Sequence, residues 1–174
     1  MGISPYRYRT VVVGTDGSPL ATPTVARAAF LAAHDDADLV IVCAFTDLTR
    51  RQEARSVATL GADVRLGQLP SRSAASSAIA AAVALAETQG ATIGAALLVD
   101  ADPAAALLAT AEEREADLLV VGAVRDTGIA DRLLGTVATE VVRRASCEVL
   151  VVRPRSDVST QPDDLAEVTL DGPT

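Results

Sequence analysis

Hydrophobic residues in this chain fall into five short runs, and the stretches between them have helical spacing. The runs are unbroken rather than alternating with polar residues, as in Val11-Val12-Val13 and in Val149 to Val152. Continuous apolar strands are typical of a parallel sheet that is covered on both faces. The predicted strands cover residues 11–14, 39–45, 91–99, 118–121 and 149–152.

Between these runs, small and apolar residues recur three and four positions apart, which predicts four amphipathic helices. The first begins near Pro23, the second near Ser73 and ends at Gly90, the third at Asp102-Pro103, and the fourth at Gly135-Thr136. The residues expected on their buried faces are Val25, Ala28, Ala29 and Ala32; Ile79, Ala82, Val83 and Ala86; Ala104, Leu107, Leu108 and Ala111; and Leu134, Val137, Ala138 and Val141. Strands that alternate with helices predict a doubly wound α/β fold with right-handed crossovers.

Composition narrows the function classes. The 174 residues suit one domain, and with 49% apolar but only 2% aromatic residues its core must be aliphatic. The net charge is −8 and there is no lysine. A nucleic-acid-binding surface is therefore not expected, and a Walker lysine and lysine Schiff-base chemistry are excluded.

Several segments bear on location and redox state. The apolar runs are too short to span a membrane and no signal peptide is visible, so we expect a soluble, cytoplasmic protein. Cys43 and Cys147 lie in or beside apolar runs, which favours buried thiols over a redox pair. Residues 155–174 contain five acids and one arginine and are expected to form a disordered tail. The arginine-rich stretch 46–73 gives no clear element.

Two loops have distinctive chemistry. Gly14-Thr15-Asp16-Gly17-Ser18 follows the first strand, and its Asp16 carboxylate could accept hydrogen bonds from a nucleotide. The same Asp and Ser could instead cap the first helix, which spacing alone favours. Gly122 follows the fourth strand, and Gly135-Thr136 opens a helix whose free N–H groups could hold phosphate. An ordinary strand-to-helix connection would also use these glycines.

These residues resemble the universal stress protein family. The resemblance rests on Asp16-Gly17-Ser18 after the first strand, on Gly122 with Gly135-Thr136 in the signature G-x2-G-x9-G-[S/T], and on the final strand with Arg153-Pro154. It covers about residues 8–154, which we take as the domain. It implies a Rossmann-like, five-stranded parallel sheet of order 3-2-1-4-5 with helices on both faces.

The resemblance also implies a function. We expect a cytoplasmic regulator that binds ATP or another adenine nucleotide where the first and fourth strands meet, any Mg²⁺ entering with the phosphates. We expect a homodimer through the fifth strand and an unidentified protein partner. We expect no catalytic residues and at most a weak ATPase activity. The residues assigned to the pocket are Gly14, Thr15, Asp16, Cys43, Gly122, Ala123, Arg125, Gly135, Thr136 and Val137.

One position departs from the family signature. Arg125 stands where nucleotide-binding members have the second glycine. An arginine there changes the loop path, fills the pocket, or binds phosphate through its guanidinium, and Gly128 could restore flexibility. The alternative function is therefore a stress protein that binds no nucleotide and acts through protein contacts. An adenylyl-transfer enzyme of the related superfamily would need a second substrate-binding domain.

Overall fold

The computed structural model describes residues 7–45, 69–123 and 134–153, in which strands and helices alternate along the chain. The strands are β1 (Thr10–Gly14), β2 (Asp38–Phe45), β3 (Thr92–Asp100), β4 (Leu118–Gly122) and β5 (Glu148–Val152). The helices are α1 (Ala21–Asp35), α3 (Arg72–Thr88), α4 (Pro103–Glu113) and α5 (Thr136–Arg144). The elements predicted from the hydrophobic pattern are confirmed to within a few residues. None of the helices described is long and apolar enough to cross a membrane.

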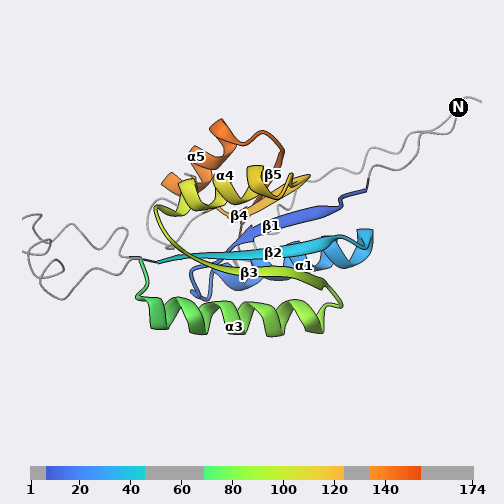
Figure 1. Ribbon diagram of the computed structural model, residues 1–174, viewed down its shortest axis with the longest axis horizontal. Helices are drawn as coiled ribbons and strands as arrows, with labels where there is room; N and C mark the ends of the chain where they lie inside the picture. Colours follow the sequence, from blue (N-terminus) through green and yellow to red (C-terminus); the bar gives the residue numbers. More distant parts are fainter. Residues whose placement is uncertain (1–6, 46–68, 124–133, 154–174) are drawn as a thin grey trace, which may run out of the picture.

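The strands form one parallel sheet of order β3-β2-β1-β4-β5, which confirms the predicted topology (Figure 1). β1 is central, and its Val12 lies opposite Val40 of β2 and Leu119 of β4. Because all strands run in one direction, their carboxyl ends share one edge. β1 connects toward β2 and β4 toward β5, so the connections diverge between β1 and β4. Ligands of doubly wound sheets bind at such a point.

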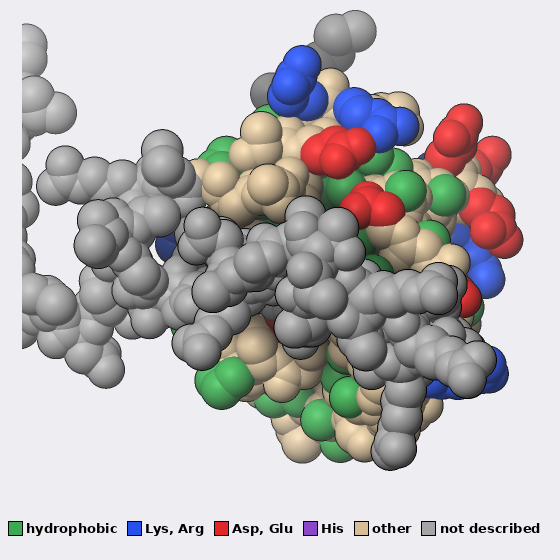
Figure 2. Space-filling model, turned by 90° about the vertical axis from the view of Figure 1, so that its left-hand side faces the viewer, with side chains coloured by type: hydrophobic (Ala, Val, Ile, Leu, Met, Phe, Trp, Pro, Cys, Tyr) green, Lys and Arg blue, Asp and Glu red, His purple; other side chains and the backbone are tan. Residues whose placement is uncertain are grey.

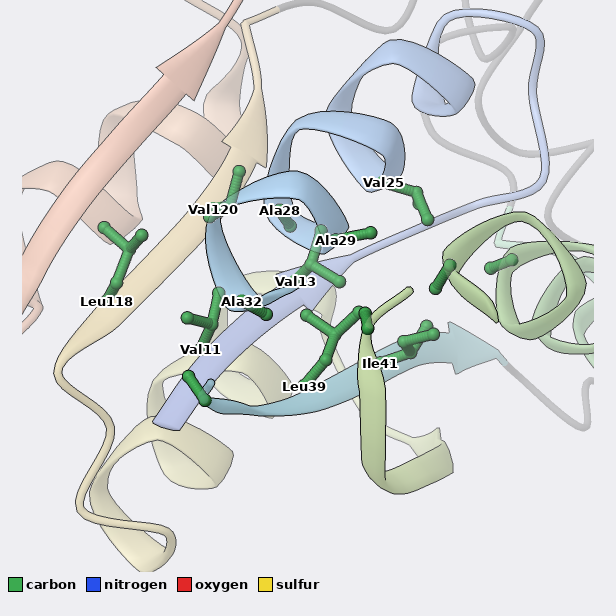
Figure 3. Close-up of a cluster of buried hydrophobic side chains, with 14 residues drawn as sticks. Val11, Val13, Val25, Ala28, Ala29, Ala32, Leu39, Ile41, Leu118 and Val120 are labelled. Carbon is green, nitrogen blue, oxygen red and sulfur yellow. The ribbon is translucent and has the colours of Figure 1, made fainter. Parts of the chain in front are cut away.

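Successive residues of each strand point to opposite faces of the sheet, and each face is covered by its own layer of helices. Val11 and Val13 belong to the core beneath α1 and α3, whereas Val12 belongs to the core beneath α4. Figure 3 shows α1 lying across β1 and β4, with its alanines directed at the strand side chains. Ala28, Ala29 and Ala32 are fully buried, and their small size lets the helix approach the sheet closely.

Two of the predicted helix faces need correction. In α3 the buried stripe consists of alanines (Ala75, Ala78, Ala82 and Ala86), while the larger Ile79 and Val83 are half-buried at its margin. Small residues occupy the line of closest approach because a larger side chain there would hold the helix away from the sheet. Leu134 is 38% exposed because it precedes α5 and does not lie on its buried face.

Helix ends follow the local sequence where capping residues are present. The Asp102 side chain accepts a 3.0 Å hydrogen bond from the Ala105 N–H, with Pro103 as the first helical residue of α4. This confirms the predicted N-cap. After α3 the C-cap is Gln89, one residue earlier than the predicted Gly90, which follows it with a φ of +79°.

At the opposite, amino-terminal edge, a carboxylate joins the first segment to the fourth strand. Asp117 accepts hydrogen bonds from the N–H groups of Arg9 (2.7 Å) and Thr10 (2.9 Å). Burial of this carboxyl works to raise its pKa, but these two donors and the Arg9 guanidinium outweigh it and hold the pKa below its usual value. Cys147 lies near this carboxylate and is half-buried, whereas Cys43 is fully buried toward the other end of β2, and neither thiol forms a disulfide.

Candidate functional site

The loop after β1 begins on a fixed backbone. Gly14 pairs with Val42, and the Thr15 N–H donates a 2.9 Å hydrogen bond to the Val42 carbonyl oxygen. The loop therefore leaves the sheet in register with β2. A Cβ on Gly14 would lie 3.1 Å from a δ-carbon of Leu107, because α4 packs directly over this residue. The loop starts where the backbone has little room for a side chain.

Asp16 and its neighbours fold the loop back on itself. The Asp16 carboxylate accepts a 2.9 Å hydrogen bond from the Ser18 N–H, and the Thr15 hydroxyl accepts one of 3.2 Å from the Gly17 N–H. The N-cap of α1 is Leu20, and no side chain caps this helix. The interpretation of Asp16 or Ser18 as a helix cap is therefore wrong. Asp16 instead closes an Asx turn at the edge where β1 ends.

The second half of the site joins β4 to α5. Gly122 pairs with Val152, and the Ala123 N–H donates a 2.8 Å hydrogen bond to the Val152 carbonyl oxygen. The Ala123 carbonyl oxygen in turn accepts a 2.7 Å hydrogen bond from the Gly135 N–H. Ala123 is fully buried. These bonds hold the beginning of α5 against the end of β4, at the strand next to β1.

The N-terminus of α5 has the properties of an anion site. Gly135 is its N-cap with extended backbone (φ −61°, ψ 162°), and no side chain of the described residues caps the helix. The first N–H groups of a helix have no partner within it, and they carry partial positive charge. Thr136, the first helical residue, is exposed and adds a hydroxyl, whereas Val137 packs against the core beneath α5. The arrangement suits an anionic group such as a phosphate.

Gly14, Thr15, Asp16, Gly122 and Ala123 thus lie at the carboxyl ends of the neighbouring strands β1 and β4, and Gly135, Thr136 and Val137 at the beginning of α5. Figure 2 looks onto this edge. One of the described residues assigned to the pocket lies apart from this group. The Cys43 side chain is buried in a cluster with Phe45, Ala75 and Ala78, between β2 and α3. Arg125 lies outside the described residues, as does Gly128.

A surface hollow adjoins the site without coinciding with it. It runs along the outer side of α5 and shares Thr136 with the predicted pocket. Its other lining residues are Leu134, Thr139, Glu140, Arg143 and Arg144. Gly14, Asp16 and Gly122 do not line it. We therefore place the candidate site at the β1–β4 edge, where the backbone constraints converge, and not in this hollow.

Sequence reasoning missed the residues that shape the β1 loop from behind. A Cβ on Gly17 would lie 2.7 Å from the Cβ of Ala78, and Gly17 has a φ of +75°. Leu107 lies against Gly14 from the other face of the sheet. The Asp16-Gly17 pair is a turn signal that could have marked Gly17. Leu107 was predicted only as part of a helical stripe, and Ala78 was not among the residues predicted to be buried.

Comparison with known proteins settles the family. The family model described as "Universal stress protein family" matches residues 7–153, which is most of the chain. The chain belongs to the universal stress protein family. The predicted family membership is confirmed, and it agrees with the sheet order and with the glycines at the ends of β1 and β4.

Relatives of known sequence extend the match over nearly their whole length. Universal stress protein Rv1636 of Mycobacterium tuberculosis (strain H37Rv) is 38% identical over 145 residues, covering 83% of this chain and 96% of the relative. Universal stress protein MJ0531 of Methanocaldococcus jannaschii is 30% identical over 151 residues, covering 84% of this chain and 82% of the relative.

Solved structures share the fold. A universal stress protein crystallised in complex with cAMP is 35% identical, with a TM-score of 0.63, and the match covers 85% of this chain and 98% of that one. The universal stress protein from Archaeoglobus fulgidus in complex with dAMP is 18% identical, with a TM-score of 0.57, covering 84% and 98%. The second likeness supports the fold alone.

Proposed function

We propose that this universal stress protein binds an adenine nucleotide at the carboxyl edge between β1 and β4. The observation that carries the proposal is the pair of backbone hydrogen bonds through Ala123, to Val152 (2.8 Å) and from Gly135 (2.7 Å). They hold an uncapped helix N-terminus beside the end of β4, next to the β1 loop that contains Asp16. A homologue that is 35% identical was crystallised with cAMP, which supports an adenine nucleotide as the ligand.

Each half of the site would contact a different part of the nucleotide. The N–H groups at the start of α5 and the Thr136 hydroxyl would bind phosphate oxygens. The Asp16 carboxylate would accept hydrogen bonds from ribose hydroxyl or base amino groups, since an ionised carboxylate is an acceptor only. Gly14 and Gly17 would let the ligand approach the loop backbone. Any Mg²⁺ would enter with the phosphates; the described residues contain no cluster of His, Cys, Asp and Glu fit to hold a metal.

We propose further that the protein acts as a cytoplasmic regulator and not as an enzyme, with at most a weak ATPase activity. Phosphate release from ATP, measured over hours against a heat-denatured control, tests this part. Turnover comparable to a dedicated ATPase, in the range of 1–100 per second typical of phosphoryl-transfer enzymes, would contradict it.

We also propose a homodimer through β5. This strand lies at one edge of the sheet, and its residues from Val149 to Val152 are apolar and half-buried. An exposed apolar edge strand promotes uncontrolled association, and pairing with the same strand of a second copy would cover it symmetrically. The protein partner through which the regulator acts is not identified by these residues.

The alternative is a universal stress protein that binds no nucleotide and acts through protein contacts alone. Arg125 at the position of the second signature glycine is the feature that favours it. The anion site at α5 favours the nucleotide-binding proposal, because the backbone bonds that place it do not involve the side chain of residue 125.

Isothermal titration of the purified protein with cAMP, AMP, ADP and ATP decides between the two. GTP is the matched control, since it presents the same phosphates with another base. We expect saturable binding of at least one adenine nucleotide and weaker binding of GTP. If the folded protein binds no adenine nucleotide, the proposal is wrong and the alternative, a protein that acts through protein contacts alone, remains.

A further inference from the structure

The turn at Asp16-Gly17 rests directly on α3, a helix that supplies none of the predicted pocket residues. A Cβ on Gly17 would lie 2.7 Å from the Cβ of Ala78 and 3.4 Å from its Cα. Real Cβ atoms do not approach one another this closely, so Gly17 occupies space that no other residue could enter. Ala78 is 7% exposed, and it is clustered with Cys43, Phe45 and Ala75 at the end of β2.

The two sides of this loop differ in stiffness. On the α4 side, a Cβ on Gly14 would lie 3.1 and 3.2 Å from the two δ-carbons of Leu107, which are the ends of a flexible side chain. On the α3 side, Gly17 faces a Cβ that is fixed to the helix backbone. Leu107 can change rotamer to accommodate a shift, whereas Ala78 can move only with its helix. Ala78 is therefore the rigid support of the loop.

The loop between these supports is held as a unit. Its start is bonded to β2 through the Thr15 N–H, and its end to α1 through the Ala21 N–H, which donates to the Ser18 carbonyl oxygen at 3.0 Å. Between them, the Asp16 carboxylate holds the Ser18 N–H at 2.9 Å. A displacement of Gly17 is therefore transmitted to Asp16, its neighbour in the same turn.

We propose that Ala78 is a positioning residue for the nucleotide: the size of its side chain sets where the Asp16-Gly17 turn lies, and thereby the affinity of the site. The ligand part rests on the nucleotide-binding function proposed above. Because the contact joins α3 to the site, a partner that shifts α3 would change nucleotide affinity, and the nucleotide would change the affinity of that partner by the same factor.

The test compares Ala78→Val with Ala82→Val. Ala82 is 4% exposed, one turn further along α3, and packs against the core beneath α1 instead of against the loop. Both changes add two methyl groups to a buried alanine, so both should lower the melting temperature through overpacking. Only Ala78→Val should push the turn. We expect its Kd for the tightest-binding adenine nucleotide to rise about tenfold, equivalent to about 1.4 kcal/mol, and that of Ala82→Val to change less than about twofold.

A second measurement separates this inference from the proposed function. Amide resonances of Gly17 and Ser18, recorded without nucleotide, should shift in Ala78→Val and stay in place in Ala82→Val. If the wild type binds no nucleotide but these resonances shift in Ala78→Val, the proposed function fails, whereas the claim that Ala78 positions the turn is supported. If the wild type binds, and Ala78→Val binds equally well with unshifted resonances, the inference is overturned and the proposed function stands.

Should Ala78→Val not fold, the milder pair Ala78→Ser and Ala82→Ser replaces it. Each serine adds a single oxygen atom to the alanine side chain. α3 already contains several serines and can accept one more. We expect the same contrast, with smaller shifts at Gly17 and an affinity loss of about threefold, equivalent to about 0.7 kcal/mol. Identical spectra and affinities in the two serine variants would overturn the role of Ala78.

Discussion

The N–H of Gly135 donates a 2.7 Å hydrogen bond to the carbonyl oxygen of Ala123, so the first residue of the signature Gly-Thr pair is fixed to the end of β4. This bond joins two backbone groups that lie twelve positions apart in the sequence. It holds the first N–H groups of α5 at the end of β4 without using the side chain of residue 125. In the proposed function, the backbone places the phosphate site without Arg125, so the effect of this side chain on binding can be measured separately.

Replacing Arg125 with glycine tests that effect. We expect Arg125→Gly to weaken ATP binding by about 1.5–3 kcal/mol, the range for a hydrogen bond to a charged group. The loss should shrink at high salt, because salt screens an exposed ionic contact. Titration with ATP and AMP provides the measurement, and Arg114→Gly, which removes the same charge after α4 at the opposite edge, is the control. If the wild type binds no nucleotide in the titration but the Arg125→Gly variant does, the proposed function is overturned.

Removing the Asp16 carboxylate should weaken nucleotide binding by about 1–3 kcal/mol while the fold survives. The loss to stability should be about 1 kcal/mol, because one hydrogen bond to the Ser18 N–H disappears. Asp102→Ala is the matched control: it deletes the N-cap of α4 at a comparable cost of about 1 kcal/mol, away from the β1–β4 edge. Unchanged calorimetric affinity in a folded Asp16→Ala variant would remove Asp16 from the site.

Alanine at Gly17 and at Gly90 should have different costs. Both glycines have positive φ (+75° and +79°), but a Cβ on Gly90 would meet nothing within 4 Å, whereas one on Gly17 would strike Ala78. Gly90→Ala should lower the free energy of unfolding by about 1–2 kcal/mol for the left-handed backbone. Gly17→Ala should lower it by a further 1–3 kcal/mol or so for overpacking. Urea unfolding of both variants measures the difference. Equal losses of unfolding free energy would show that the loop moves away from Ala78 at no cost.

An aspartate at Val151 tests the proposed dimer. Val151→Asp would place an unpaired charge on the edge strand β5, and burying such a charge is costly. Light scattering should report a monomer or an aggregate. Val99→Asp on the opposite edge strand β3 is the control, because both residues pack at the margin of the same core. If Val151→Asp stays a soluble dimer, the subunits associate through another surface.

The pH dependence of stability should contain a contribution from Asp117. Its pKa in the folded protein lies below the usual value, so the folded state holds fewer protons than the unfolded state near that pH. The stabilisation is therefore complete above the ordinary carboxyl pKa of about 3.9 and is lost as pH falls through the lower folded value. Asp117→Asn should lower the free energy of unfolding at neutral pH by about 1.5–3 kcal/mol.

The same substitution should flatten the decline of stability in acid, below about pH 4. Glu113→Gln, on the exposed end of α4, removes the same formal charge and serves as the control. Melting temperatures of the three proteins between neutral pH and pH 3 provide the comparison. An acid decline in Asp117→Asn as steep as in the wild type would show that other carboxylates govern it.

The order of strands and helices could be predicted from the sequence, because burial leaves a periodic trace along each element. Val11-Val12-Val13 is unbroken since α1 covers one face of β1 and α4 the other. Asp102-Pro103 marks the start of α4 because capping is local, and its bond reaches three residues along the chain. Asp16 and the Gly135-Thr136 pair were found through short motifs that also lie within single loops.

Only the tertiary structure decided what those motifs lie against. The turn at Gly17 is supported by Ala78, which is 61 positions later in the chain, and Asp117 holds the N–H of Arg9 across 108 positions. The sequence pattern placed Ala82 on the buried face of its helix and gave no separate signal for Ala78, although both repeat at helical spacing on one face of α3. Their difference comes from the position of that helix over the end of β1. Contacts between distant segments depend on how the layers pack: the periodic pattern of an element shows that a residue is buried, but not which residue it contacts.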